Sequence, residues 1–154
     1  MKILIIDGNN LIHKIPKYRK LFKLNPESVQ LSLLESVRLK LGTDEKLILF
    51  FDGFGNIKSK EIRFSGSLTA DELIKKYIEE NYTKQKITVV SSDTGITGLA
   101  KVCCCKIIKS EDFLKEIKSS EKEKRNINQL FLYDKEKPEK INKTEFEEFR
   151  KYFT

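Results

Sequence analysis

The sequence has few of the residues that build cross-linked or zinc-bound proteins. Its three cysteines are adjacent (Cys103, Cys104 and Cys105), it has one histidine, His13, and it has no tryptophan. Adjacent cysteines cannot form a disulfide framework, and zinc sites need spaced Cys and His ligands. We therefore expect the cysteines to be small apolar residues of a strand in a reducing compartment. His13 is expected to be a surface or helix residue rather than a catalyst.

Long apolar runs are absent as well. No run approaches the ~18 residues of a membrane span. The first residues, with one lysine and four aliphatics before Asp7, do not match a signal peptide. The length of 154 residues suits one domain, and 39% apolar with 34% charged residues is typical of a soluble chain with a charged surface. We expect a cytoplasmic protein that does not bind membranes.

The positive charge is unevenly distributed. The formal net charge is +7, and residues 14–23 hold five basic residues and no acidic one, with Tyr18 and Phe22 among them. Residues 119–154 are nearly neutral by comparison. A basic cluster is either an ordinary solvated face or a track for a polyanion, and both interpretations stay open at this point.

Short apolar runs and helical periodicity alternate along the chain. The runs predict buried strands over residues 3–6, 46–51, 87–90 and 102–108, with a further short strand at residues 61–64. Helical spacing predicts helices over residues 26–41, 70–78, 94–101 and 110–118, with Asn25, Thr69 and Ser110 as caps. This alternation predicts an α/β fold with a mostly parallel sheet flanked by helices. The charged segment 119–154 is expected to be a partly helical extension, with a helix around residues 144–152.

Three of the predicted strands end at or near an aspartate. Asp7, Asp52 and Asp93 should therefore converge, because the C-terminal ends of parallel strands share one edge of the sheet. Asp71 is the second residue of a predicted helix that could begin at the same edge. Each acid also has a simpler interpretation: Asp7 and Asp52 as turn residues, Asp71 as a partner of the helix dipole and Asp93 as a helix cap.

Carboxylates gathered at one edge repel one another unless a cation lies among them. Mg²⁺ or Mn²⁺ suits oxygen ligands of this kind, completed by water and a substrate phosphate. Polar neighbours that could orient the carboxylates or the metal-bound waters are Asn9, Asn10, Thr69, Ser92 and Thr94. Beside a basic track, such a site indicates metal-assisted phosphodiester hydrolysis, in which one ion activates water and a second could stabilise the leaving oxygen.

Four motifs together resemble a known family. They are Ile5-Ile-Asp-Gly-Asn-Asn-Leu-Ile12, Phe51-Asp-Gly53, Thr69-Ala-Asp-Glu-Leu-Ile74 and Val89-Val-Ser-Ser-Asp93. Their order and spacing resemble the NYN domain, in particular its YacP-like branch within the PIN-like nuclease superfamily, and Ser110-Glu-Asp-Phe-Leu114 resembles the closing segment of that branch. The resemblance covers residues 1–118. It implies a three-layer Rossmann-like fold with an acidic, Mg²⁺-dependent site that cleaves RNA, and some members are linked to translating ribosomes.

Carried over residue by residue, the resemblance gives a catalytic set of Asp7, Asp52, Asp71 and Asp93. Asp7, Asp71 and Asp93 are the expected ligands of one or two Mg²⁺ or Mn²⁺ ions. The sequence departs from the family at Asn9, where many relatives have another residue, and after Ser119, where no pattern matches.

We therefore expect a metal-dependent endoribonuclease that acts on RNA, on ribosomes or elsewhere. The expected RNA-binding residues are Lys14, Lys17, Tyr18, Arg19, Lys20, Lys23, Lys58, Lys60 and Arg63. Two alternatives stay open: a non-catalytic RNA- or ribosome-binding module with a nuclease-like fold, and a phosphatase or nucleotidase acting on small molecules.

Overall fold

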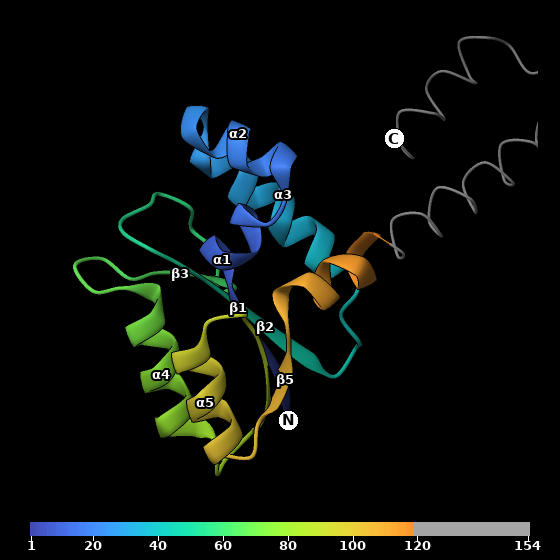
Figure 1. Ribbon diagram of the computed structural model, residues 1–154, viewed down its shortest axis with the longest axis vertical. Helices are drawn as coiled ribbons and strands as arrows, with labels where there is room; N and C mark the ends of the chain where they lie inside the picture. The colour runs from blue at the N-terminus through green and yellow to red at the C-terminus, as the bar shows by residue number, and fades with distance from the viewer. Residues whose placement is uncertain (119–154) are drawn as a thin grey trace, which may run out of the picture. The chain divides into compact units, whose positions relative to one another are not determined.

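Five strands form one parallel sheet in the order β3-β2-β1-β4-β5. The computed structural model describes residues 1–118. The strands are β1 (Lys2–Asp7), β2 (Glu45–Phe51), β3 (Ile62–Phe64), β4 (Lys86–Val90) and β5 (Lys106–Ile108). Central β1 pairs with β2 on one side and with β4 on the other, and every pairing is parallel (Figure 1). The predicted parallel sheet is confirmed.

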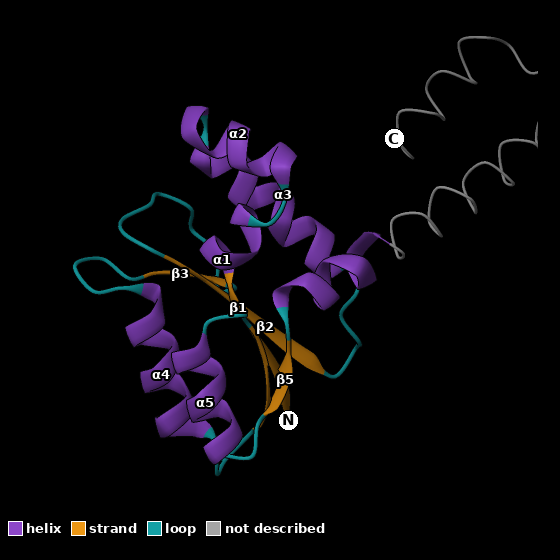
Figure 2. Cartoon of the chain, in the orientation of Figure 1, coloured by secondary structure: helices purple, strands orange, loops and turns teal. Residues whose placement is uncertain are grey.

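Helices cover both faces of this sheet. They are α1 (Gly8–His13), α2 (Pro16–Leu24), α3 (Pro26–Arg38), α4 (Ala70–Asn81) and α5 (Thr94–Val102). Residues 110–118 are also helical. Figure 2 shows the strands between α4 and α5 on one side and α3 on the other. The predicted extension over residues 119–154, with its helix around residues 144–152, lies outside the described residues.

The core follows from the alternation of side chains along the central strands. Ile3 and Ile5 of β1 belong to one apolar cluster that also contains Phe50 of β2 and Ile74 and Ile78 of α4. The intervening residues of β1 are buried as well and point to the opposite face. Both faces of β1 are therefore apolar, as its continuous aliphatic run predicts. Within residues 1–118, no helix combines the length and apolarity needed to cross a bilayer.

Two predicted caps fix helix starts. The Asn25 side chain accepts a hydrogen bond from the Ser28 backbone N–H at 3.1 Å, and Thr69 Oγ1 accepts one from Glu72 N–H at 3.1 Å. Helix α3 ends at Arg38, three residues before the predicted end. Its last turn tightens, because Lys40 N–H bonds to Val37 and Leu41 N–H to Arg38, each three residues back. Helices α1 and α2 were not predicted.

The prediction of a strand over residues 102–108 is wrong in its first half. Val102 ends α5, and Cys104 has a φ of 59°, in the left-handed region. Cys105 N–H bonds to the Ala100 carbonyl at 2.8 Å, which closes the helix in a Schellman-type turn. Glycine is the usual residue at the Cys104 position, so the sequence carries no signal for this turn. The cysteines thus occupy a helix C-terminus rather than a strand, and all three are free thiols.

Candidate active site

The C-terminal edge of the sheet is open between β1 and β4. The crossover from β1 to β2 runs through α1–α3, whereas the crossover from β4 to β5 runs through α5, on the opposite face (Figure 1). The chain segments that follow β1 and β4 therefore diverge. Ligands of open parallel sheets bind at such a switch point. Asp7, the last residue of β1, and Asp93, which follows β4, both belong to it.

Asp7 is a buried carboxylate. Its residue is 8% exposed, and it accepts long hydrogen bonds from Asn10 N–H (3.5 Å) and Ser91 Oγ (3.3 Å). Burial raises the pKa of Asp7 to about 6; the two hydrogen bonds oppose this, and the charges of Asp52 and Asp93 add to it. Within residues 1–118, no cationic side chain pairs with Asp7. Its charge is therefore left without compensation.

Asp52 and Asp93 are both caps and neighbours of Asp7. Asp52 Oδ1 accepts a hydrogen bond from Ala70 N–H at 2.7 Å, at the start of α4, and Asp93 Oδ1 accepts one from Ile96 N–H at 3.0 Å. The simpler interpretation of Asp93 as a helix cap is thus correct, and Asp52 serves α4 in the same way. In the described part of the chain, the second oxygen of each carboxylate has no hydrogen-bond or ion-pair partner. Capping therefore fixes both side chains and leaves one oxygen of each free.

Asp71 pairs with a residue that the sequence analysis missed. Lys75 Nζ lies 3.0 Å from Asp71 Oδ2, whereas Asp71 Oδ1 is buried and has no hydrogen-bond partner. The hydrogen bond to Asp71 and the nearby charge of Asp93 raise the pKa of Lys75. The only signal for this pair in the sequence is the i,i+4 spacing of an acid and a lysine on one helix, which is common on helix surfaces.

The predicted asparagines connect the strand ends. Asn9 Oδ1 accepts a hydrogen bond from Asp52 N–H at 2.8 Å. Asn10 Oδ1 accepts bonds from Ser92 N–H at 3.3 Å and from Ser110 Oγ at 2.6 Å. These amides therefore hold the segments after β1, β2 and β4 together. The two amide side chains contact backbone N–H groups and a hydroxyl beside the carboxylates, and their role as supports of the carboxylates stays a prediction.

The prediction of Ser110 as a helix cap is wrong. Ser110 is the first helical residue, and its hydroxyl donates to Asn10 Oδ1 instead of accepting a hydrogen bond from a helix N–H. Its backbone N–H donates to Ser92 Oγ at 3.1 Å, and Ser92 Oγ donates to Glu111 Oε2 at 2.9 Å. Glu111 also pairs with Lys14 at 2.6 Å, which lowers the pKa of Glu111 to about 2. Lys14 is therefore engaged within the protein.

Ser91, rather than Ser92, is the serine that contacts the acids. It is completely buried, it donates to Asp7, and its Oγ accepts a hydrogen bond from Asp93 N–H at 3.1 Å. Because the two serines are adjacent, the sequence does not show which one points toward the edge. Thr69 caps α4, and Thr94 is the exposed first residue of α5.

The basic residues fall into two groups. Lys17, Arg19, Lys20 and Lys23 are exposed on α2, a helix with no buried residue that follows α1 directly. Tyr18 of the same helix is half-buried. Lys58 is exposed in the loop between β2 and β3. The α2 residues thus form one exposed basic surface close in sequence to Asp7.

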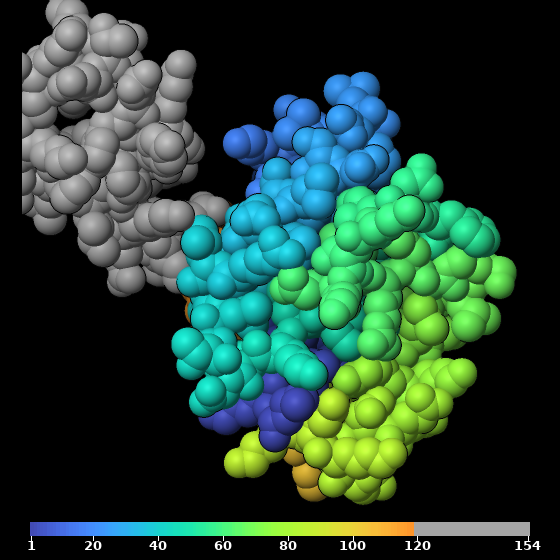
Figure 3. Space-filling view, turned by 180° about the vertical axis from the view of Figure 1, so that it is seen from behind, coloured from blue at the N-terminus to red at the C-terminus, as the bar shows by residue number. Residues whose placement is uncertain are grey.

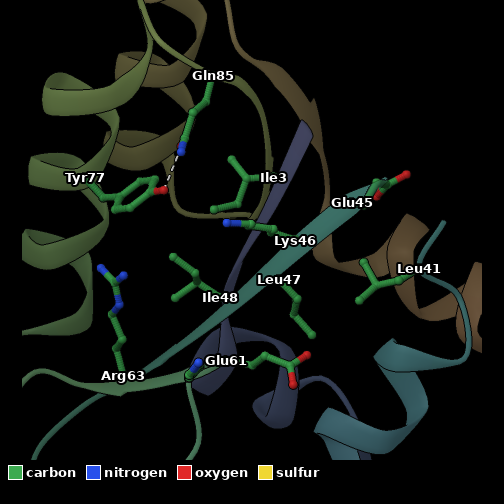
Figure 4. A pocket seen from close by; sticks show the side chains of 11 residues that line it. Ile3, Leu41, Glu45, Lys46, Leu47, Ile48, Glu61, Arg63, Tyr77 and Gln85 are labelled. Atoms are coloured by element: carbon green, nitrogen blue, oxygen red, sulfur yellow. Dashed lines mark hydrogen bonds between the residues drawn. The ribbon is translucent and has the colours of Figure 1, made fainter. Parts of the chain in front are cut away.

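Lys60 and Arg63 instead line a cavity of about 490 Å³ at the other end of β2 from Asp52. Arg63 lies over the Tyr77 ring, 5.5 Å from its centroid, and the Tyr77 hydroxyl bonds to Gln85 at 2.7 Å. Figure 4 shows this arrangement, and the cavity opens on the face drawn in Figure 3. The structure therefore does not group Lys60 and Arg63 with the carboxylates.

The donor set suits a hard divalent ion in its chemistry. All four acids offer carboxylate oxygen atoms as ligands. One of these oxygen atoms, Oδ1 of Asp71, is buried and has no hydrogen-bond partner. However, within residues 1–118 no three acidic, histidine or cysteine side chains are close enough together to share one ion. An ion at this edge would thus need water for most of its ligands, as Mg²⁺ commonly does.

Comparison with known families identifies the fold. The model of the YacP-like NYN domain matches residues 4–154. The chain belongs to this family. The match extends beyond the resemblance seen in residues 1–118 and includes the C-terminal segment. No curated protein matches the sequence significantly.

Two solved structures share the fold of this NYN domain. The crystal structure of Rae1 (YacP) from Bacillus subtilis has a TM-score of 0.70 at 23% identity, covering 88% of this chain and 84% of that one. A single-residue mutant of the same protein has a TM-score of 0.70 at 24% identity, covering 85% and 84%. Together with the parallel sheet, these matches confirm the predicted Rossmann-like, PIN-like fold.

Proposed function

We propose that this NYN domain is a metal-dependent endoribonuclease. The observation that carries the proposal is Asp7, a buried carboxylate at the switch point of the sheet. It has no cationic partner among residues 1–118, and the negative charges of Asp52 and Asp93 lie near it. Leaving a charge buried and uncompensated costs stability, so a site of this kind is a candidate for function. A divalent ion would supply the missing charge.

In the proposed site, Asp7, Asp71 and Asp93 hold Mg²⁺ or Mn²⁺ through carboxylate oxygens and bridging waters, and Asp52 supports them. When bound, the ion polarises the phosphate and lowers the pKa of the attacking water. Asn9 and Asn10 keep the strand ends together, and Ser91 orients Asp7 and the backbone of Asp93.

The RNA backbone would lie along α2. Lys17, Arg19, Lys20 and Lys23 are exposed there and can contact phosphates. Tyr18 is half-buried, so its ring offers at most one edge to a base. A helix that carries several cations and no acid suits a polymeric anion better than a single phosphate group. The proposed substrate is RNA, either on ribosomes or another structured cellular RNA.

A non-catalytic RNA-binding module is the second candidate. The observation that favours it is the Lys75–Asp71 pair, together with the lack of a three-carboxylate group in residues 1–118. Against it, pure phosphate binding gains nothing from four acids at one edge, because they repel the ligand.

The two candidates are separated by a cleavage assay on mixed RNA and DNA with Mg²⁺, Mn²⁺ or EDTA. Asp7→Asn should reduce RNA cleavage by about 100-fold or more, since even residues that only orient metal ligands account for 10- to 100-fold. Asp44→Asn, which removes an exposed acid just before β2, is the matched control and should cleave normally. Equal metal-stimulated cleavage by Asp7→Asn and the wild type would overturn the proposal.

A further inference from the structure

Lys75 places a positive charge inside the acidic edge. Its ammonium lies 3.0 Å from Asp71 Oδ2, and the two side chains are only partly exposed, at 38% and 36%. Most i,i+4 pairs on helix surfaces are isolated from other elements. The Lys75–Asp71 pair, in contrast, lies next to helix α5, because Lys75 Nζ is close to the Gly95 backbone.

Gly95 provides the space that the Lys75 ammonium uses. A Cβ atom at Gly95 would lie 2.9 Å from Lys75 Nζ and 3.1 Å from Asp93 Oδ1. Lys75 Nζ and Asp93 Oδ1 therefore both lie next to the place where a Cβ atom of residue 95 would be. A residue larger than glycine at position 95 would displace one of these two atoms. The lysine is thus located between Asp71 of α4 and Asp93, the cap of α5.

We propose that Lys75 is a positioning residue that keeps a divalent ion from binding directly between Asp71 and Asp93. The ammonium occupies Asp71 Oδ2, and its charge repels a second cation from the same two carboxylates. An ion held by Asp7, Asp71 and Asp93 would thereby reach Asp71 and Asp93 through bridging waters. This inference rests on the proposed nuclease function, but what it predicts, and what can be measured, is only how tightly the protein binds a divalent ion.

Within residues 1–118, no three carboxylates are placed to share an ion, and Asp71 already has the Lys75 ammonium as a partner. Asp71 turns one oxygen to Lys75, and its second oxygen is buried without a partner. Removing the lysine would free Oδ2 of Asp71 for a metal.

The test is a titration of the protein with Mn²⁺ alone, followed by calorimetry and by the electron paramagnetic resonance of free Mn²⁺. Lys75→Met should bind Mn²⁺ at least about fivefold more tightly than the wild type, because a unit charge about 4 Å away contributes at least this much even in water. Lys75→Arg, which keeps the charge, should bind as the wild type does. Gly95→Ala, which crowds the ammonium, should change binding in the direction of Lys75→Met.

Lys76→Met is the matched control. It removes the same charge from the next residue of α4, which is exposed and has no ion pair with the acids. It should leave Mn²⁺ binding unchanged, and the double variant Asp71→Asn with Lys75→Met should lose the gain. Circular dichroism should show folded protein throughout, since exposed ion pairs contribute little to stability.

Equal Mn²⁺ binding by wild type and Lys75→Met would overturn the inference, as would an equal gain in Lys76→Met. These outcomes are independent of the nuclease proposal, because the titration contains no RNA. Conversely, a wild type that fails to cleave RNA would overturn the nuclease proposal and leave the role of Lys75 standing.

Discussion

Asp7 lies in a buried environment that favours the protonated form of its carboxyl group. Burial raises its pKa from an ordinary 3.8 to about 6, because the charged form loses hydration that two long hydrogen bonds do not replace. Well below pH 3.8 the residue is protonated in both the folded and the unfolded chain. Between pH 4 and 6 the unfolded chain releases its proton first, so the free energy of unfolding falls as the pH rises.

Asp7→Asn should therefore stabilise the protein at neutral pH in the absence of metal. The gain should be near zero at pH 4 and approach at most about 3 kcal/mol above pH 7, since each pKa unit corresponds to about 1.4 kcal/mol. Urea unfolding at both pH values, with EDTA present, measures it. Asp44→Asn should show no such pH dependence, and an Asp7→Asn variant less stable than the wild type at pH 7.5 would contradict the expected cost of the buried charge.

The sequence predicts the four acids but only part of their environment. Asp7 and Asp52 follow from strand patterns that end in Asp-Gly, a signal that is local. Lys75 and Ser91 depend on where α4 and β4 lie relative to other segments, which no local pattern contains. Ser91 and Ser92 differ only in the direction of their side chains, and this is set by the chain path after Val90.

At the level of elements, Gly8 of α1 and Gly98 of α5 differ in their surroundings. A Cβ at Gly8 would lie 2.3 Å from the ring of Phe51, a residue with no exposed surface, whereas a Cβ at Gly98 would meet nothing within 4 Å. Gly8 therefore allows α1 to approach β2 closely just after Asp7. Gly98 has no comparable packing role, and it only lowers the helix propensity of α5.

Gly8→Ala should accordingly destabilise the protein by about 1–3 kcal/mol, as overpacking of a filled core does. Gly98→Ala should stabilise it by up to about 1 kcal/mol. Thermal unfolding of the two variants measures the difference. If both changes had the same sign, the close contact between α1 and Phe51 would not be the reason for glycine at position 8.

Element boundaries were predicted well where side chains mark them. Asn25 and Thr69 accept hydrogen bonds at helix starts, so their residue types announce the caps. Helix α2 was missed although Tyr18, Leu21 and Phe22 lie at helical spacing, because this stripe is short, none of its residues is fully buried, and cations surround it. The end of α5 was missed because a cysteine, Cys104, adopts the conformation that glycine usually takes.

For the whole molecule, the exposed cations of α2 define the surface on which RNA binding should depend. Replacing Lys17, Arg19 and Lys20 together by glutamine should weaken RNA binding and reduce the slope of log affinity against log salt by about 2, at about 0.7 per lost phosphate contact. Fluorescence anisotropy of labelled RNA between 50 and 200 mM salt, about the range in which such contacts respond, measures this.

Replacing Lys60 and Arg63 by glutamine is the matched control, because both residues line the cavity at the other end of β2. This variant should keep most of the salt dependence. An equal loss of slope in both variants would mean that the RNA path extends across the edge of the sheet to β3.

The central position of β1 has a consequence for the order in which the protein can fold. Strand β1 pairs with residues more than forty and more than eighty positions later in the chain, from Lys2 to Glu45 and from Lys2 to Lys86. Pairings of such long range form late and slowly. Asp7 therefore stays in a solvated, incomplete environment until residue 93 has been synthesised and β4 has docked. The edge that carries Asp7, Asp52 and Asp93 is therefore completed only after most of the described residues have been made.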